Sequence, residues 1–230
     1  MSKTLALLHT SHVLIPTFSK LCQENLPECR IFHMVDESLI KNTIATGALT
    51  KPTIRRMATL VTSAHEGGAD AVMVTCSSVG PGVNVLRALF DFPILRIDEA
   101  MAEEAVRTGR RIGVLATLET TLTPTVELLR ETARAQSREV MILPCLCPGA
   151  FDAILSGDDQ RHHQIVAENL EELMRQSDVI VLAQASMAGA VRELPSELKK
   201  TPVLSSPELA IKRARLVLVA AEGQVKSHKL

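Results

Sequence analysis

The sequence predicts an α/β protein made of two pseudo-symmetric lobes, each a mostly parallel sheet flanked by helices. Along the 230 residues, short segments that are apolar throughout alternate with longer amphipathic segments. Continuous apolar strands of this kind are typical of parallel sheets that helices cover on both faces. A weak internal repeat indicates that the alternation occurs in two similar halves.

Eight strands and seven helices are predicted from this alternation. The strands are expected at Thr4–His9, Arg30–Val35, Ala71–Thr75, Pro93–Arg96, Arg111–Ala116, Glu139–Leu143, Val179–Ala183 and Val203–Leu204. The helices are expected near Leu14–Asn25, Pro52–Gly67, Asn84–Phe90, Glu99–Thr108, Thr123–Ala135, Gln160–Gln176 and Pro207–Val225. Two of the starts are marked by a capping residue followed by proline, at Thr123-Pro124 and at Ser206-Pro207.

The repeat consists of two segments that share one layout. Residues Ala69–Ser78 and Ser177–Ser186 each run from an acidic residue through an apolar strand to small polar residues. We expect a first lobe of residues 1–98 plus 205–230 and a second lobe of residues 99–204. Because ligands collect at the carboxyl ends of the strands in open α/β sheets, the two repeated loops would face each other across one cleft.

The composition excludes several classes of protein. Lys plus Arg number 25 and Asp plus Glu number 26, so no overall field would attract nucleic acid or an anionic membrane. Only 2% of the residues are aromatic, so a site cannot rely on stacking a nucleobase or a flavin. The glycine motifs of nucleotide sites and the serine-hydrolase motif are absent. No run approaches the roughly 18 apolar residues of a membrane span, and no signal-peptide pattern is present, so we expect a cytoplasmic protein.

The five cysteines do not form a recognisable framework. Their odd number and wide scatter argue against structural disulfides. Cys145 and Cys147 have one residue between them, whereas zinc and redox pairs have two, and no second pair matches. We therefore expect no metal. Both cysteines are expected after a strand of the second lobe, and the spacing leaves open whether either reaches the cleft.

The first candidate site is the loop from Thr75 to Gly82, which follows an apolar strand and is called the Cys76 loop below. A cysteine at the rim of a sheet, next to free backbone amides, is typical of an accessible thiolate. The hydroxyls of Thr75, Ser77 and Ser78 suit a carboxylate. The alternative is a buried, apolar Cys76 in a tight turn, and the local sequence does not separate the two interpretations.

Four further loops carry polar side chains after predicted strands. Thr117, Thr120 and Thr121 follow the fifth strand and suit a carboxylate, with helix capping as the alternative. Gln184 and Ser186 stand where the repeat places the Cys76 loop, and Ser186 could instead cap a helix. After the first strand, Ser11 could contact a substrate, and His9 and His12 fit a structural or hydrogen-bonding role better than a metal site. Asp36 and Glu37, after the second strand, either position a ligand or open the next segment.

Taken together, these loops resemble the Asp/Glu/hydantoin racemase superfamily. The matching segments are Asp70–Ser78, Arg111–Thr117 with Thr120-Thr121-Leu122, Asp178–Ala183, and Ser205-Ser206-Pro207. The resemblance covers nearly the whole chain. It implies two pseudo-symmetric α/β lobes with the site between them, no cofactor, and a small carboxylate substrate. In racemases of this family, a cysteine from each lobe faces the α-carbon of the substrate, and one thiolate removes the proton that the other thiol replaces.

The resemblance assigns the first cysteine to Cys76, but the second position holds Gln184, which transfers no proton. We therefore expect an isomerase of the racemase type that works through Cys76. Ser11, Gln184, Ser186 and the other loop hydroxyls are expected to be substrate ligands. A single-cysteine decarboxylase or lyase of the same superfamily is one alternative. A non-catalytic protein that binds a small anion is the other. A homodimer or higher homo-oligomer is expected on general grounds.

Overall fold

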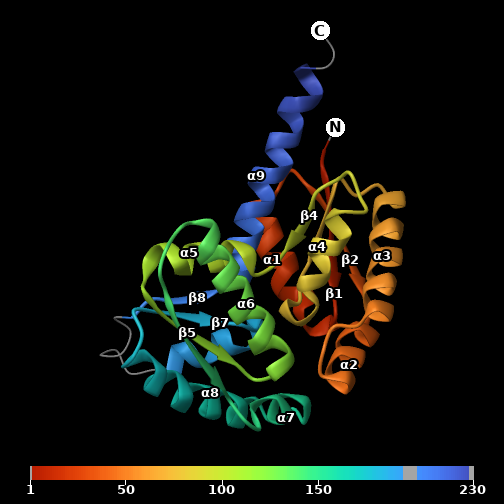
Figure 1. Cartoon of the computed structure of the whole chain (residues 1–230). Helices are drawn as coiled ribbons and strands as arrows, with labels where there is room; N and C mark the ends of the chain where they lie inside the picture. Colours follow the sequence, from red (N-terminus) through yellow and green to blue (C-terminus); the bar gives the residue numbers. More distant parts are fainter. Residues whose placement is uncertain (1, 194–200, 228–230) are drawn as a thin grey trace. The chain divides into compact units, whose positions relative to one another are not determined.

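The computed structural model describes residues 2–193 and 201–227 (Figure 1). The chain divides into two compact units, the first made of Met1–Ile97 with Pro207–Leu230 and the second of Asp98–Ser206. Each unit contains a four-stranded sheet in which every strand pairs with its neighbours in parallel. The α/β prediction, with two helix-flanked parallel sheets, is confirmed.

The first sheet has the order β2-β1-β3-β4. Its strands are β1 (Thr4–His9), β2 (Arg30–Val35), β3 (Ala71–Val74) and β4 (Ile94–Arg96). β1 and β3 are buried along their whole length. They are the two inner strands, so helices on both faces exclude water from them, as their continuous apolar sequence predicts.

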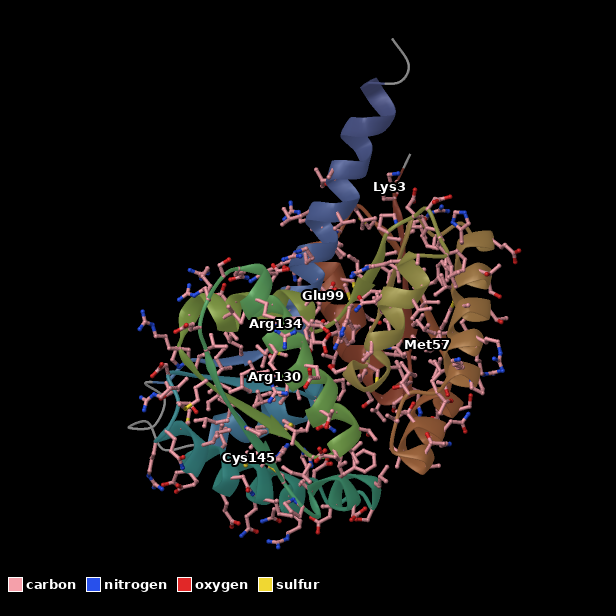
Figure 2. All side chains as sticks on the ribbon, viewed as in Figure 1. Lys3, Met57, Glu99, Arg130, Arg134 and Cys145 are labelled. Carbon is pink, nitrogen blue, oxygen red and sulfur yellow. The ribbon has the colours of Figure 1, made fainter. Side chains whose placement is uncertain are left out.

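Two layers of helices cover the first sheet. The elements are η1 (His12–Leu14), α1 (Ile15–Asn25), α2 (Glu37–Thr46), α3 (Lys51–Glu66), η2 (Ser77–Val79), α4 (Pro81–Arg87) and α9 (Ser206–Ser227). On one face, Phe18 of α1 and Ile211 of α9 pack against Leu5 and Leu7. On the other face of the sheet, α2, α3 and α4 pack against Ala6 of β1 and the other even-numbered residues of the strands. Met57 of α3 is fully buried there (Figure 2).

The second sheet repeats the first arrangement in the order β6-β5-β7-β8. Its strands are β5 (Arg111–Ala116), β6 (Met141–Leu146), β7 (Val179–Leu182) and β8 (Val203–Ser205). The other elements of the unit are α5 (Glu99–Thr108), α6 (Glu119–Ala135), α7 (Ala150–Leu155), α8 (Asp159–Met174) and η3 (Ala185–Glu193). α7, α8 and η3 pack with Leu115, Ile180 and Leu182 in one core cluster.

The acidic residue of each repeat ties two neighbouring strands together. Asp70, just before β3, accepts hydrogen bonds from the backbone of Thr4 at 2.8 Å and from Lys3 at 2.9 Å. Asp178, just before β7, accepts bonds from the backbone of Arg111 at 2.8 Å and from its guanidinium. These bonds hold the pKa of the Asp178 carboxyl below its usual range. In both units the carboxylate therefore fixes the start of the central strand.

Several elements differ from the sequence predictions, and α7 was not predicted at all. α6 begins at Glu119, so Thr123 does not cap it, and Pro124 lies inside the helix. β6 extends to Leu146, which places Cys145 within the strand and not after it. α2 was not predicted at all; it begins after Asp36, whose carboxylate accepts a hydrogen bond from the Ser38 backbone at 2.9 Å. Among the described residues, no helix combines the length and apolar character that crossing a membrane requires.

Candidate active site

The carboxyl ends of β1, β2 and β3 bring three predicted groups to one edge of the first sheet. Ser11 precedes η1 and its side chain makes no capping hydrogen bond. Asp36 follows β2, is buried, caps α2, and forms an ion pair with Arg56. Asp36 therefore opens the next segment, which was one of its two predicted roles, and its carboxylate is already occupied. Cys76 follows β3 and stands at the centre of this edge.

Cys76 is partly exposed and lies in extended backbone at the start of η2. Its side chain packs against the core cluster on the α2–α4 face of the sheet. Ser77 and Ser78 follow in η2 and are 5% and 3% exposed. Backbone amides in the first turn of a helical segment have no partner within it, so the thiol is followed by groups that can hold an anion.

Thr75 points away from Cys76, toward the α1 face of the sheet. Its hydroxyl lies 3.1 Å from the Leu8 carbonyl and 2.8 Å from Nδ1 of His9. A hydroxyl has one proton, and both of these positions lie inside the protein. The predicted role of Thr75 as a hydrogen-bond donor to a carboxylate is therefore not supported by its contacts; Thr75 anchors the end of β3.

His9 and His33 were not predicted to belong to the site. His9 is fully buried, and its Nε2 lies 2.9 Å from Nδ1 of His33. Burial, together with the neighbouring His33, lowers the pKa of His9 to about 4. Burial also lowers the pKa of His33. Both rings are therefore neutral near pH 7 and act as hydrogen-bonding groups, as the sequence predicts for His9.

Arg96 is another residue that sequence reasoning missed. It ends β4, pairs in register with Val74, and is only 5% exposed. Its guanidinium lies against Gly80, where a Cβ atom would stand 2.5 Å from Nε of Arg96. A buried cation therefore touches the Cys76 loop. The available signal was a charged residue at the end of a predicted buried strand.

The second sheet places Gln184 at the position equivalent to Cys76. Val74 of β3 pairs with Leu8 of β1, and Leu182 of β7 pairs with Leu115 of β5. Cys76 lies two residues beyond Val74, and Gln184 lies two residues beyond Leu182. By the same count, Thr117 is equivalent to Thr10, a buried residue that the sequence analysis did not single out.

Gln184 and Thr117 bind each other through two hydrogen bonds. The backbone amide of Thr117 donates to Oε1 of Gln184 at 2.7 Å, and Nε2 of Gln184 donates to Oγ1 of Thr117 at 2.7 Å. Because the Thr117 hydroxyl accepts one bond here, its own proton remains available for another acceptor. Gln184 thus orients Thr117 as a hydrogen-bond donor.

The first turn of α6 adds further donors at the same edge. The Thr120 hydroxyl is buried and has no hydrogen-bond partner among the described residues. Thr121 is 2% exposed. The first amides of α6 have no acceptor within the helix, and its N-terminus carries partial positive charge. This arrangement suits a carboxylate. Ser186 lies within η3 and is partly exposed.

Cys145 and Cys147 lie on the α8 side of the second sheet. Both pack in the cluster that contains α8, with Cys147 fully buried and Cys145 partly exposed (Figure 2). A hydrogen bond from Cys147 lowers the pKa of Cys145 to about 7, and the same bond raises the pKa of Cys147. No group of three His, Cys, Asp or Glu side chains with metal-site geometry occurs in the described part of the chain.

The sequence profile of the Asp/Glu/hydantoin racemase family matches residues 8–214, a span that includes Cys76, Thr117 and Gln184. The chain belongs to this family. No curated protein sequence gives a match to this racemase-family protein.

Solved structures agree with the family assignment at the level of the fold. A glutamate racemase from Francisella tularensis in complex with D-glutamate matches with a TM-score of 0.75 at 13% identity, covering 96% of this chain and 82% of that one. An allantoin racemase from Klebsiella pneumoniae matches with a TM-score of 0.67 at 18% identity, covering 96% and 89%. An aspartate racemase from Picrophilus torridus matches with a TM-score of 0.67 at 13% identity, covering 91% of each chain. Since these proteins bear different substrate names, the shared fold does not select a substrate.

Proposed function

We propose that this racemase-family protein is a cofactor-independent isomerase that acts on a small carboxylate through Cys76. The observation that carries the proposal is the position of Cys76: partly exposed, directly after β3, at the carboxyl edge of a parallel sheet. Ligands of open α/β folds bind at that edge. In a chain of this family, the thiolate then acts either as the base that removes a proton from the α-carbon or as a nucleophile.

Each unit offers hydroxyl and amide groups that are proposed to bind the oxygens of a carboxylate substrate. A proton next to a carboxylate is a very weak acid, so the site must stabilise the negative charge that develops on the oxygens as the proton leaves. Ser77, Ser78 and Ser11 would serve this purpose in the first unit. In the second unit the Thr117 hydroxyl retains a free proton, and the Thr120 hydroxyl has no hydrogen-bond partner among the residues that the structure describes. Thr121 and Ser186 would complete the set.

A single-cysteine lyase is the second candidate, and the contacts of Gln184 favour it over symmetric two-thiol racemisation. Gln184 occupies the position equivalent to Cys76, and both polar atoms of its amide are engaged with Thr117. An amide neither gives nor takes a proton in the physiological range. Decarboxylation needs only one acid: the bond to the carboxylate breaks, CO2 leaves, and the thiol protonates the resulting carbanion.

Incubation in D2O with a panel of amino acids, hydroxy acids and malonates separates the two chemistries. Proton NMR reports exchange of the α-proton for deuterium if the protein is an isomerase, and loss of CO2 with deuterium at the new position if it is a lyase. Cys76→Ala is expected to abolish either signal and leave the circular dichroism spectrum unchanged. Cys145→Ala, which removes a partly exposed thiol from the other unit, is the matched control. Unchanged turnover in Cys76→Ala would refute the proposal.

The remaining alternative is a non-catalytic protein that binds a small anion. Thiol reactivity distinguishes it from an enzyme, because a catalytic thiolate is alkylated faster than a free thiol at neutral pH. The rate at Cys76 can be followed with iodoacetamide and peptide mass spectrometry. Alkylation of Cys76 at the rate of a model thiol, combined with no turnover on the panel, would favour the binding protein.

A further inference from the structure

A continuous chain of hydrogen bonds runs from the surface of α1 to the end of β3. Ser19 Oγ lies 3.0 Å from Nε2 of His33, whose Nδ1 lies 2.9 Å from Nε2 of His9. Nδ1 of His9 lies 2.8 Å from Oγ1 of Thr75. The first member is exposed and His9 is fully buried. The chain therefore crosses from solvent to the residue directly before Cys76.

When both histidine rings are neutral, two different arrangements of the protons give every polar atom of this hydrogen-bond chain a partner. In one arrangement Thr75 donates to Nδ1 of His9, Nε2 of His9 donates to His33, and His33 donates to Ser19. In the other every bond is reversed, and the Thr75 hydroxyl donates to the Leu8 carbonyl at 3.1 Å. Either arrangement holds the Thr75 side chain against β1. No arrangement allows both rings to be doubly protonated, since two N–H groups would then face each other.

We propose that His9 is a positioning residue for Cys76, acting through the hydrogen bond between its Nδ1 and the Thr75 hydroxyl. Thr75 and Cys76 are consecutive, and their side chains lie on opposite faces of the sheet, so His9 acts on the backbone that leads to the thiol. The inference rests on the proposed role of Cys76.

Two observations distinguish this role from ordinary core packing. His9 lies beside Phe18 in an otherwise apolar layer, where an aliphatic side chain would fill the space without needing a partner. The second unit has a different polar contact at the equivalent place, because there the Gln184 side chain binds Thr117, directly after the end of β5. In both units a polar contact between the ends of the two inner strands holds the residue at the Cys76 position or the residue before it.

The test compares variants that keep or remove one hydroxyl. Thr75→Val preserves the shape of the side chain and removes its hydrogen bond, whereas Thr75→Ser keeps the bond. His9→Asn removes the other partner. His65→Asn is the control, since His65 is hydrogen-bonded to Ala69 at the opposite end of β3 and stacks on Phe92. Each variant is assayed for kcat and KM on the substrate found with the panel, and for the rate of Cys76 alkylation, which needs no substrate.

Thr75→Val and His9→Asn are each expected to lower kcat about tenfold with KM within about twofold, and to move the alkylation rate of Cys76 by about threefold or more. Thr75→Ser and His65→Asn should stay within about twofold of the parent in every measurement. Combining Thr75→Val with His9→Asn should give no further loss, because both remove the same bond.

The inference would be overturned if the losses in kcat of the two single variants multiplied in the double variant. Equal effects of Thr75→Ser and Thr75→Val would overturn it as well. If Thr75→Val does not fold, His33→Gln tests the same chain from its outer end, and an unchanged kcat and alkylation rate there would also overturn it. If the parent turns over no substrate on the panel, the proposed function fails, while the alkylation rates still decide whether His9 positions Cys76.

Discussion

Two glycines of the Cys76 loop allow a sharp comparison, because the same added methyl group meets different neighbours. At Gly80 a Cβ atom would lie 2.5 Å from Nε and 2.9 Å from Cζ of Arg96, and 3.0 Å from the Ser77 carbonyl. At Gly82 it would lie 3.0 Å from the Sδ and Cε atoms of Met57. Ordinary contacts of this kind begin near 3.4 Å, so Gly80→Ala requires a shift of about 1 Å and Gly82→Ala a few tenths.

The cost follows from how freely each neighbour can move. Arg96 is 5% exposed and the Ser77 carbonyl is backbone, so neither yields without disturbing the loop. Overpacking of this kind costs about 1–3 kcal/mol. Gly80 has φ of −50°, which alanine adopts without strain, and the stiffer unfolded chain returns about 0.4–1 kcal/mol. We therefore expect Gly80→Ala to lower the free energy of unfolding by about 1–2 kcal/mol and Gly82→Ala to change it by less than about 1 kcal/mol.

Urea unfolding followed by circular dichroism measures both changes, since the chain has no Trp or Tyr for fluorescence. Repeating Gly80→Ala in an Arg96→Met background tests the assigned cause: most of the loss should disappear there, and kcat should also respond to Gly80→Ala alone. A Gly80→Ala protein as stable as the parent, or a Gly82→Ala protein that loses as much, would refute this account of the loop.

Two further predictions concern stability. Gly113→Ala should destabilise the second unit by about 1–3 kcal/mol in the same urea assay. The added Cβ would lie 2.6 Å from Ile180, 2.7 Å from Leu173 and 2.7 Å from Ser177. A neutral or stabilising effect would contradict the packing around β5. His9 has a pKa of about 4 when folded and 6.5 when unfolded, so the unfolded chain binds more protons as pH falls through this window. Stability should be retained above pH 6.5 and decline by up to about 3 kcal/mol toward pH 4, with a smaller decline in His9→Asn; identical pH curves for the two proteins would exclude His9 as the cause.

The sequence was sufficient for the sheets, because their inner strands are buried and continuously apolar. It failed at α6 because Thr123-Pro124 has the pattern of a helix start, whereas the helix begins at Glu119. Pro124 is tolerated inside α6, where it cannot donate the usual bond to the carbonyl of Thr120. α2 was missed because its N-terminal signal, Asp36, was also a candidate ligand.

The candidate site was only partly predictable for a related reason. Position after a strand identified Cys76, Thr117 and Gln184, since parallel strands bring their carboxyl ends to one edge. Which atoms were already engaged depended on partners distant in sequence: Gln184 lies 67 residues from Thr117, and Thr75 lies 66 residues from His9. Local patterns carry no information about such pairs. His9 and His33 lie on one face of the first sheet because Leu7 pairs with His33, and the sequence alone does not give this register.

The path of the chain also sets an order in which the protein can be completed during synthesis. The second unit is one uninterrupted stretch, so all of its core residues are synthesised before α9. The first unit is different, because Ala210, Ile211, Ala214 and Leu218 of α9 close the same core layer as Leu5 and Leu7 of β1. Until these residues of α9 leave the ribosome, the part of that face which α9 covers is exposed to water, although α1 is already present. The unit that carries Cys76 is started before the second unit and completed after it, so truncation within α9 would damage that unit and not the unit inserted into it.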